Sequence, residues 1–320
     1  MPVVIAAAVA KPVAPVEFDD DGLQRKLPVV VFSHGMCAMR TTYAAFCCDL
    51  ASYGYVVAAI EHRDGSACVA SYSTKKGQQA WLPHSHVGPL ASVPMEIRRI
   101  QLRHRVLEVQ QVLDLLERVN DGDISASANL RSGRASMNPS LLKGCLDLDD
   151  IALAGHSFGG ATAVCAAGVD KRVKCVVAMD AWWEPFGKDE YERLGGGVPL
   201  LCVDSVQFDW PNMRRMREEF FKLRCRCTKN GLQMITMAYV IKGSAHANQS
   251  DFPLVLPWLT RKMRMAGSLD ANLNRLINSK LCLDFLRQHL KPPGTEWLAE
   301  IDMTEKEATH LEQHPMWFSE

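Results

Sequence analysis

Short apolar, β-branched runs alternate with amphipathic stretches along this chain. Buried strands are predicted at residues 28–32, 55–60, 150–154, 173–179, 198–203 and 234–241. Helices are predicted at residues 43–52, 96–119 and 161–167, the longest from apolar positions that recur every three or four residues. This alternation indicates βαβ units, and therefore an α/β fold with a mostly parallel central sheet and helices on both faces.

The pattern divides the chain into three parts. Residues 1–26 are expected to be a disordered leader, 27–291 a single folded domain and 292–320 a C-terminal tail. The first ten residues are apolar, but no basic residue precedes them, which favours a leader over a secretory signal. Residues 64–95 and 120–143 are polar and contain glycine, so both are expected to be irregular surface segments.

Composition excludes several classes of function. The 36 basic and 36 acidic residues balance, so a nucleic-acid partner is not expected. No run of about 20 apolar residues is present, as a membrane-spanning helix would require. The 11 cysteines, an odd number mostly within apolar runs, predict buried thiols in a reducing compartment such as the cytoplasm. Cys225 and Cys227 form a CxC pair without a matching second pair, so no zinc or other metal site is expected.

Residues 155–159 read Gly-His-Ser-Phe-Gly, a G-x-S-x-G pattern between an apolar strand and a helix of small residues. In such a sharp strand-to-helix turn, side chains at Gly155 and Gly159 would clash, and Ser157 would take a strained conformation. The free N–H groups at the start of the helix would face developing negative charge. The pattern in this context predicts Ser157 as a catalytic nucleophile, in preference to a purely structural turn.

A serine nucleophile needs a base, and the base needs an orienting acid. In this kind of fold the chain order is serine, acid, histidine. His246 directly follows a predicted strand, whereas His289 lies in a helical stretch and His310 and His314 lie in the polar tail. His246 is therefore the predicted base.

Spacing alone leaves the acid open. Asp180 and Asp204 each close a strand after the nucleophile and are equally suitable, and Asp209 is a more distant alternative. The oxyanion hole should use two backbone N–H groups. One is that of Phe158, and the other is expected from Met36 in the loop after an early strand.

Several sequence blocks resemble the platelet-activating factor acetylhydrolases of the plasma and type II intracellular group. The blocks occur in the family's order within residues 27–291 and read FSHGM (32–36), RTTY (40–43), EHRDGSA (61–67), GHSFGGAT (155–162), MDAW (179–182), GSAH (243–246), SDF (250–252) and LDFLRQHL (283–290). The resemblance implies an α/β-hydrolase fold, with Asp180 as the acid and Met36 as the second oxyanion donor.

The resemblance also implies a function. It is that of a calcium-independent serine esterase that needs no cofactor and hydrolyses the sn-2 short-chain or oxidised acyl ester of platelet-activating factor-like phospholipids. The family carries a longer segment before the FSHGM block than this chain does. A catalytically inactive homologue therefore stays open as an alternative. A general esterase for water-soluble esters, which would use the same residues, is a second alternative.

An apolar segment follows the predicted base. Residues 252–259 include Leu254, Leu256 and Trp258 and are followed by basic residues. Such a composition is typical of a segment that lies at a lipid headgroup boundary, so these residues are expected to form a lip that contacts membranes or lipid particles and the phospholipid substrate. An ordinary core helix fits the pattern equally well.

Overall fold

The structure is a computed structural model of the chain. It describes residues 26–73, 78–85, 93–123, 139–187, 198–208, 210–226, 236–290 and 302–313. Residues 1–25 of the expected leader, residues 124–138 of the expected surface segment, Asp209 and Cys227 lie outside the described residues.

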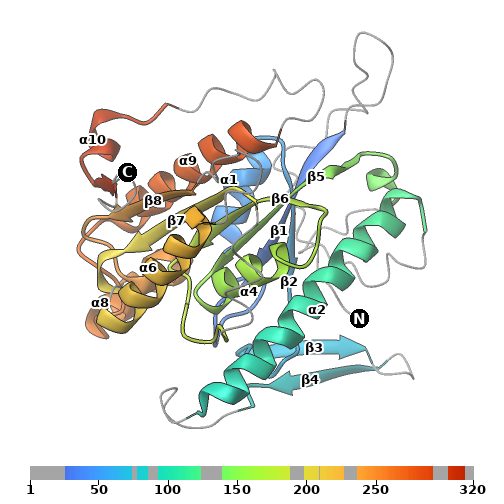
Figure 1. The fold of residues 1–320 in the computed structure, drawn as a ribbon, viewed down its shortest axis with the longest axis horizontal. Coiled ribbons are helices and arrows are strands. Elements are labelled where there is room, and N and C mark those ends of the chain that lie inside the picture. The colour runs from blue at the N-terminus through green and yellow to red at the C-terminus, as the bar shows by residue number, and fades with distance from the viewer. Residues whose placement is uncertain are drawn as a thin grey trace.

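A seven-stranded sheet forms the centre of the molecule (Figure 1). Its strand order is β2-β1-β5-β6-β7-β8-β9, and every neighbouring pair is parallel except β8 and β9. The strands are β1 (Leu27–Ser33), β2 (Val56–Ile60), β5 (Leu146–His156), β6 (Val173–Met179), β7 (Leu200–Ser205), β8 (Thr236–Ile241) and β9 (Leu311–Gln313). The predicted α/β-hydrolase architecture, with its mostly parallel sheet, is confirmed.

Helices cover both faces of the sheet, because successive side chains of a buried strand point to opposite sides. In β1, Val29 and Val31 pack into one core cluster while Val30 and Phe32 pack into the other. The first cluster is closed by α2 (Met95–Asn120), α4 (Phe158–Ala167) and α6 (Pro211–Arg226), and the second by α1 (Ala44–Ser52) and α9 (Ala271–His289).

The remaining elements are short. They are the helices α7 (Phe252–Val255), α8 (Pro257–Lys262) and α10 (Glu305–Ala308) and the 3-10 helices Pro139–Leu142, Val206–Phe208 and His246–Gln249. Within the described parts of the chain, no helix is long and apolar enough to cross a bilayer.

One predicted irregular segment contains a hairpin. Within residues 64–95, β3 (Val69–Ser73) pairs antiparallel with β4 (Gln79–Pro83) (Figure 1). The pattern missed it because a two-stranded ribbon needs no continuous apolar face. The exposed Trp81 breaks the inside–outside alternation that would have predicted a strand.

The expected tail also contributes to the sheet. β9 pairs antiparallel with β8 at the sheet edge. The Nζ of Lys280 on α9 lies 2.8 Å from a carboxylate oxygen of Glu307, which attaches α10 to the main body. A three-residue edge strand carries too short an apolar pattern to be predicted.

Candidate active site

The sheet brings the candidate side chains to one edge. Ser157 directly follows β5, Asp180 directly follows β6, and His246 begins a 3-10 helix a short loop after β8. The carboxyl ends of neighbouring parallel strands lie at the same edge, which is where catalytic groups of open α/β sheets gather.

Ser157 occupies a strained turn. Its φ is 58° and its ψ is −119°, a backbone conformation that residues other than glycine seldom adopt. A hydrogen bond from its N–H to the Met179 carbonyl oxygen, 2.9 Å long, ties the turn to β6. The turn places Ser157 at the N-terminus of α4, whose free N–H groups and dipole attract negative charge.

Two glycines make this turn sterically feasible. A Cβ atom on Gly155 would lie 2.2 Å from the Gly159 carbonyl oxygen, and one on Gly159 would lie 1.9 Å from the Ser33 carbonyl oxygen. Both clashes are with backbone atoms, which cannot rotate away. The glycines of the G-x-S-x-G pattern are therefore required for packing.

We expect Gly159→Ala to destabilise the fold by about 3 kcal/mol or more, the upper range for overpacking a tight core. Gly160→Ala is the matched control, because its added methyl would meet the Ala181 Cβ at 3.0 Å and no closer atom. Thermal unfolding of both variants measures the difference. Equal stability of the two variants would show that β1 and the Ser157 turn are not packed tightly against each other at Gly159.

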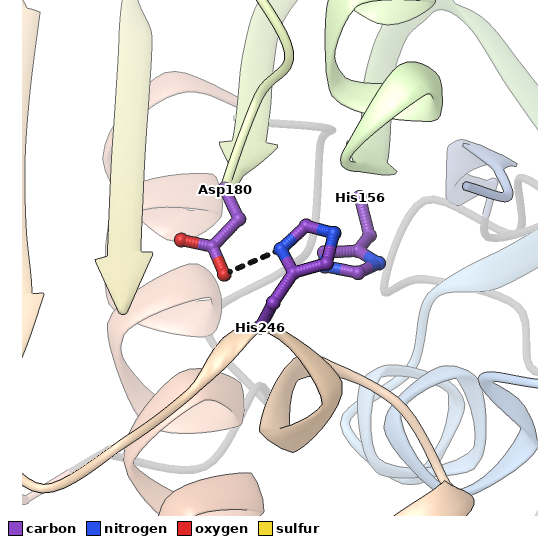
Figure 2. Close-up of side chains that lie close together, drawn as sticks. All are labelled: His156, Asp180 and His246. Carbon is purple, nitrogen blue, oxygen red and sulfur yellow. Dashed lines mark hydrogen bonds and ion pairs between the residues drawn. The ribbon is translucent and has the colours of Figure 1, made fainter. Parts of the chain in front are cut away.

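Asp180 and His246 are hydrogen-bonded, as Figure 2 shows. The distance from His246 Nδ1 to Asp180 Oδ2 is 3.0 Å, and the carboxylate is fully buried. The same carboxylate accepts hydrogen bonds from the Ser205 N–H at 2.6 Å and the Ser205 hydroxyl at 2.7 Å. A proton on Nδ1 leaves Nε2 of His246 as an acceptor, the form that a general base requires.

Two rings lie against the ring of His246. Phe208 stacks on it with a centroid distance of 3.8 Å and an interplanar angle of 11°. The ring of His156 lies at a centroid distance of 4.3 Å. Burial, together with the charge of His246, lowers the pKa of His156 well below its usual range. A neutral His156 does not compete for protons with the candidate base.

The alternative acids are not at the base. Asp204 lies 2.6 Å from the Nη1 of Arg217 in a buried ion pair, and Asp209 lies outside the described residues. The atoms of His156, Asp180 and His246 that could bind a metal ion lie within 4.8 Å of one another, which is the spacing of a possible metal site. The Asp180 carboxylate already accepts three hydrogen bonds, however, so the chemistry of this cluster is that of an acid–base pair.

Met36 lies in a loop whose peptide planes are fixed by hydrogen bonds. The Gly35 carbonyl accepts from His34 Nδ1 at 2.7 Å, and the Gly35 N–H donates to the Tyr43 hydroxyl at 3.1 Å. The N–H of a trans peptide points opposite to its carbonyl, so the Met36 N–H points away from the His34 ring. A Cβ on Gly35 would be 3.2 Å from the Ser157 Cβ, so this loop runs beside the nucleophile.

The His34 ring holds this loop in its neutral form. Its Nε2 accepts a hydrogen bond from the His62 N–H at 3.2 Å, which leaves the proton on Nδ1. Burial, aided by the charge of Arg105, lowers the pKa of His34 well below its usual range. The Phe158 N–H, the other predicted oxyanion donor, lies at the first residue of α4.

Sequence reasoning missed several residues that support the site. Ser205 holds Asp180, Phe208 stacks on His246, and Arg105 contacts the His34 loop. Tyr43 belongs to the RTTY block of the sequence, which indicates no role for it, yet its hydroxyl lies 2.8 Å from His156 Nδ1. For Ser205 alone, the position in the sequence offered a usable signal of a role in the site, because it is the last residue of a strand that ends at the catalytic edge of the sheet.

The predicted lip forms α7 and α8. Trp258 is 70% exposed and Leu256 46% exposed, while Leu254 is half-buried. The Nζ of Lys262 lies 4.8 Å from the centroid of the Trp258 ring. The segment is therefore an exposed apolar surface with a basic border, and the alternative of an ordinary core helix does not fit.

The chain is similar to known proteins over most of its length. Residues 4–307 match the family model "Platelet-activating factor acetylhydrolase, isoform II". The platelet-activating factor acetylhydrolase of Bos taurus is 35% identical over 273 residues, which are 83% of this chain and 57% of that protein. The one of Gallus gallus is 33% identical over 293 residues, 87% of this chain and 66% of that protein. The chain thus spans less than two thirds of the length of these relatives.

A solved structure shares the fold. The ferulic acid esterase of Streptomyces cinnamoneus superposes with a TM-score of 0.64, covering 97% of this chain and 84% of its own, at 20% sequence identity. At that identity the likeness speaks for the architecture alone.

Proposed function

Because this chain belongs to the isoform II family of platelet-activating factor acetylhydrolases, we propose that it is a serine esterase for platelet-activating factor-like phospholipids. The observation that carries the proposal is the Asp180–His246 pair beside a serine held at a φ of 58° at a helix N-terminus. An inactive homologue would have no need to keep that strained serine together with an oriented acid–base pair.

The proposed reaction runs in two steps. His246 Nε2 removes the Ser157 hydroxyl proton as Oγ attacks the sn-2 carbonyl carbon, and the N–H groups of Met36 and Phe158 stabilise the oxyanion. His246 then gives the proton to the departing lysolipid oxygen, which leaves an acyl-enzyme. Water, deprotonated by His246, attacks that ester and releases the short carboxylic acid and free Ser157. Asp180 keeps its charge throughout and orients the ring.

Hydrolysis of two phospholipids, measured beside that of 4-nitrophenyl acetate, tests this proposal. We expect rapid cleavage of 1-alkyl-2-acetylglycerophosphocholine and slow cleavage of a phosphatidylcholine with two long chains. A calcium chelator should lower neither activity. A general esterase, the alternative function, would cleave 4-nitrophenyl acetate well and the acetyl lipid no better.

We also propose that α7 and α8 bind the lipid surface from which the substrate is taken. Three observations support this role: the exposed apolar side chains of Val255, Leu256 and Trp258, the exposed basic residues that follow them, and the proximity of this segment to His246 in the chain. Apolar side chains with a basic border suit the headgroup region. The free thiols of Cys37, Cys48 and Cys68, all exposed, fit a cytoplasmic enzyme that associates with membranes peripherally.

The double substitution Leu256→Asp with Trp258→Ala should weaken binding to phosphatidylcholine vesicles at least about tenfold. Burying one leucine side chain is worth about 1.5–3 kcal/mol, and 1.4 kcal/mol corresponds to a factor of ten. Hydrolysis of 4-nitrophenyl acetate should be unchanged, since Ser157, Asp180 and His246 follow strands of the central sheet and neither substitution alters them. Vesicle sedimentation beside the soluble-ester assay measures both.

Leu107→Asp is the matched control, because Leu107 is 55% exposed on α2. That variant should sediment with vesicles as the wild type does. Equal binding by the double variant and this control would reject the lip as the lipid-binding surface.

A further inference from the structure

Arg105 is a buried cation on α2 that takes no part in the reaction proposed above. Its Nε lies 2.9 Å from Asp64 Oδ2 and 3.1 Å from the Ser66 hydroxyl oxygen, and its Nη2 lies 2.6 Å from the same hydroxyl. The side chain is fully buried. The third nitrogen, Nη1, donates to the His34 carbonyl oxygen at 2.6 Å.

The same guanidinium also contacts the nucleophile turn. Its central carbon lies 4.5 Å from the centroid of the Phe158 ring, within the range of a cation–π interaction, which is stronger where water is excluded. Phe158 is fully buried. Arg105 thus contacts both segments that carry the proposed oxyanion donors, the loop before Met36 through the His34 carbonyl and the start of α4 through the Phe158 ring.

The bond to His34 acts on a planar group. Arg105 holds the carbonyl of the His34–Gly35 peptide, and the Tyr43 hydroxyl holds the N–H on its opposite side. Two bonds on opposite sides of one peptide plane fix its rotation. The next plane, Gly35–Met36, continues from it and carries the donor N–H.

We propose that Arg105 is a positioning residue for the oxyanion hole, fixing the Met36 and Phe158 N–H groups at the separation that one oxyanion requires. This inference rests on the proposed function, because the hole acts only in acyl transfer. A charge pair with Asp64 would not require the third nitrogen. The planar fork of arginine makes the Asp64, Ser66 and His34 contacts together, whereas a lysine ammonium is a single point charge.

The test compares Arg105→Lys with Arg224→Lys. Arg224 is a matched control, since it is also buried, donates to the Val198 carbonyl oxygen at 2.7 Å and lies over the Phe220 ring, 5.8 Å from its centroid. Turnover of 4-nitrophenyl acetate is expressed per active site, with sites counted by complete fluorophosphonate labelling. A purely structural role would reduce the number of sites and not the turnover of each.

For Arg105→Lys we expect kcat per site to fall about 10- to 100-fold with KM little changed, because losing a single oxyanion donor costs about 10²- to 10³-fold. Arg224→Lys should keep the wild-type kcat per site. Inhibition by an alkyl trifluoromethyl ketone, which forms an oxyanion on Ser157, should weaken by the same factor as kcat. Ser66→Ala removes the hydroxyl to which both Nε and Nη2 of Arg105 donate, so it should lower kcat per site by a smaller factor. This variant provides the test if Arg105→Lys does not fold.

A wild-type kcat per site and an unchanged inhibition constant in both Arg105→Lys and Ser66→Ala would overturn the positioning role while leaving the esterase proposal intact. An inactive, unlabelled wild-type protein would instead reject the esterase proposal, and this inference with it.

Discussion

Ser157→Ala is expected to lower ester hydrolysis by about 10³-fold or more, since the nucleophile acts only in the reaction and its loss cannot be replaced by binding. The fold should be unaffected. Ser157 is held by its backbone bonds to Met179 and Trp182, which alanine keeps. The initial rate of 4-nitrophenyl acetate hydrolysis, compared with circular dichroism of the same sample, measures this effect. Retained activity in a folded variant would show that another nucleophile carries the reaction.

Asp180→Asn is expected to lower kcat by about 10⁴-fold, the scale found when a triad acid is neutralised. The amide would remove the negative charge that stabilises protonated His246 and would favour the wrong ring tautomer. The Ser205 bonds would hold the substituted side chain near its place, so the loss should appear in kcat and not in folding. Steady-state kinetics on a soluble ester measures it.

Asp204→Asn is the matched control at the end of the neighbouring strand. Asp204 pairs with Arg217 and not with His246, so its neutralisation should lower the melting temperature and leave turnover per labelled site close to wild type. A larger catalytic loss in Asp204→Asn than in Asp180→Asn would mean that the assignment of the acid is reversed.

Most of the central sheet could be predicted from the sequence, because buried parallel strands are short, continuous apolar runs and the intervening amphipathic helix is long. The β3–β4 hairpin and β9 could not. A two-stranded ribbon and a three-residue edge strand bury too little surface to impose a pattern. In addition, β9 pairs with β8, a strand that is distant from it in the sequence.

The candidate site shows a similar division. The strained Ser157 turn could be predicted because Gly155 and Gly159 mark it in the sequence, and both would clash if substituted. The acid could not be chosen by spacing, since Asp180 and Asp204 both end strands. The family resemblance implies Asp180, and the three-dimensional structure shows that Asp180 contacts His246 while Asp204 pairs with Arg217.

Supporting residues were the least predictable. Arg105 lies on α2, which packs on one face of the sheet, 71 positions from the His34 carbonyl that it binds. Within an amphipathic pattern, a buried arginine is indistinguishable from one on the solvated face. Its partners, Asp64 and Ser66, lie in a segment whose polarity suggested only an irregular surface loop.

The most direct test of a Ser157-centred serine esterase is reaction of the wild-type chain with a fluorophosphonate, followed by intact mass measurement and peptide mapping. The site described here predicts one phosphonyl group per folded molecule, attached to the peptide that contains Ser157 and missing in Ser157→Ala. A folded protein that takes up no phosphonyl group, or takes it up at a different residue, would contradict the account.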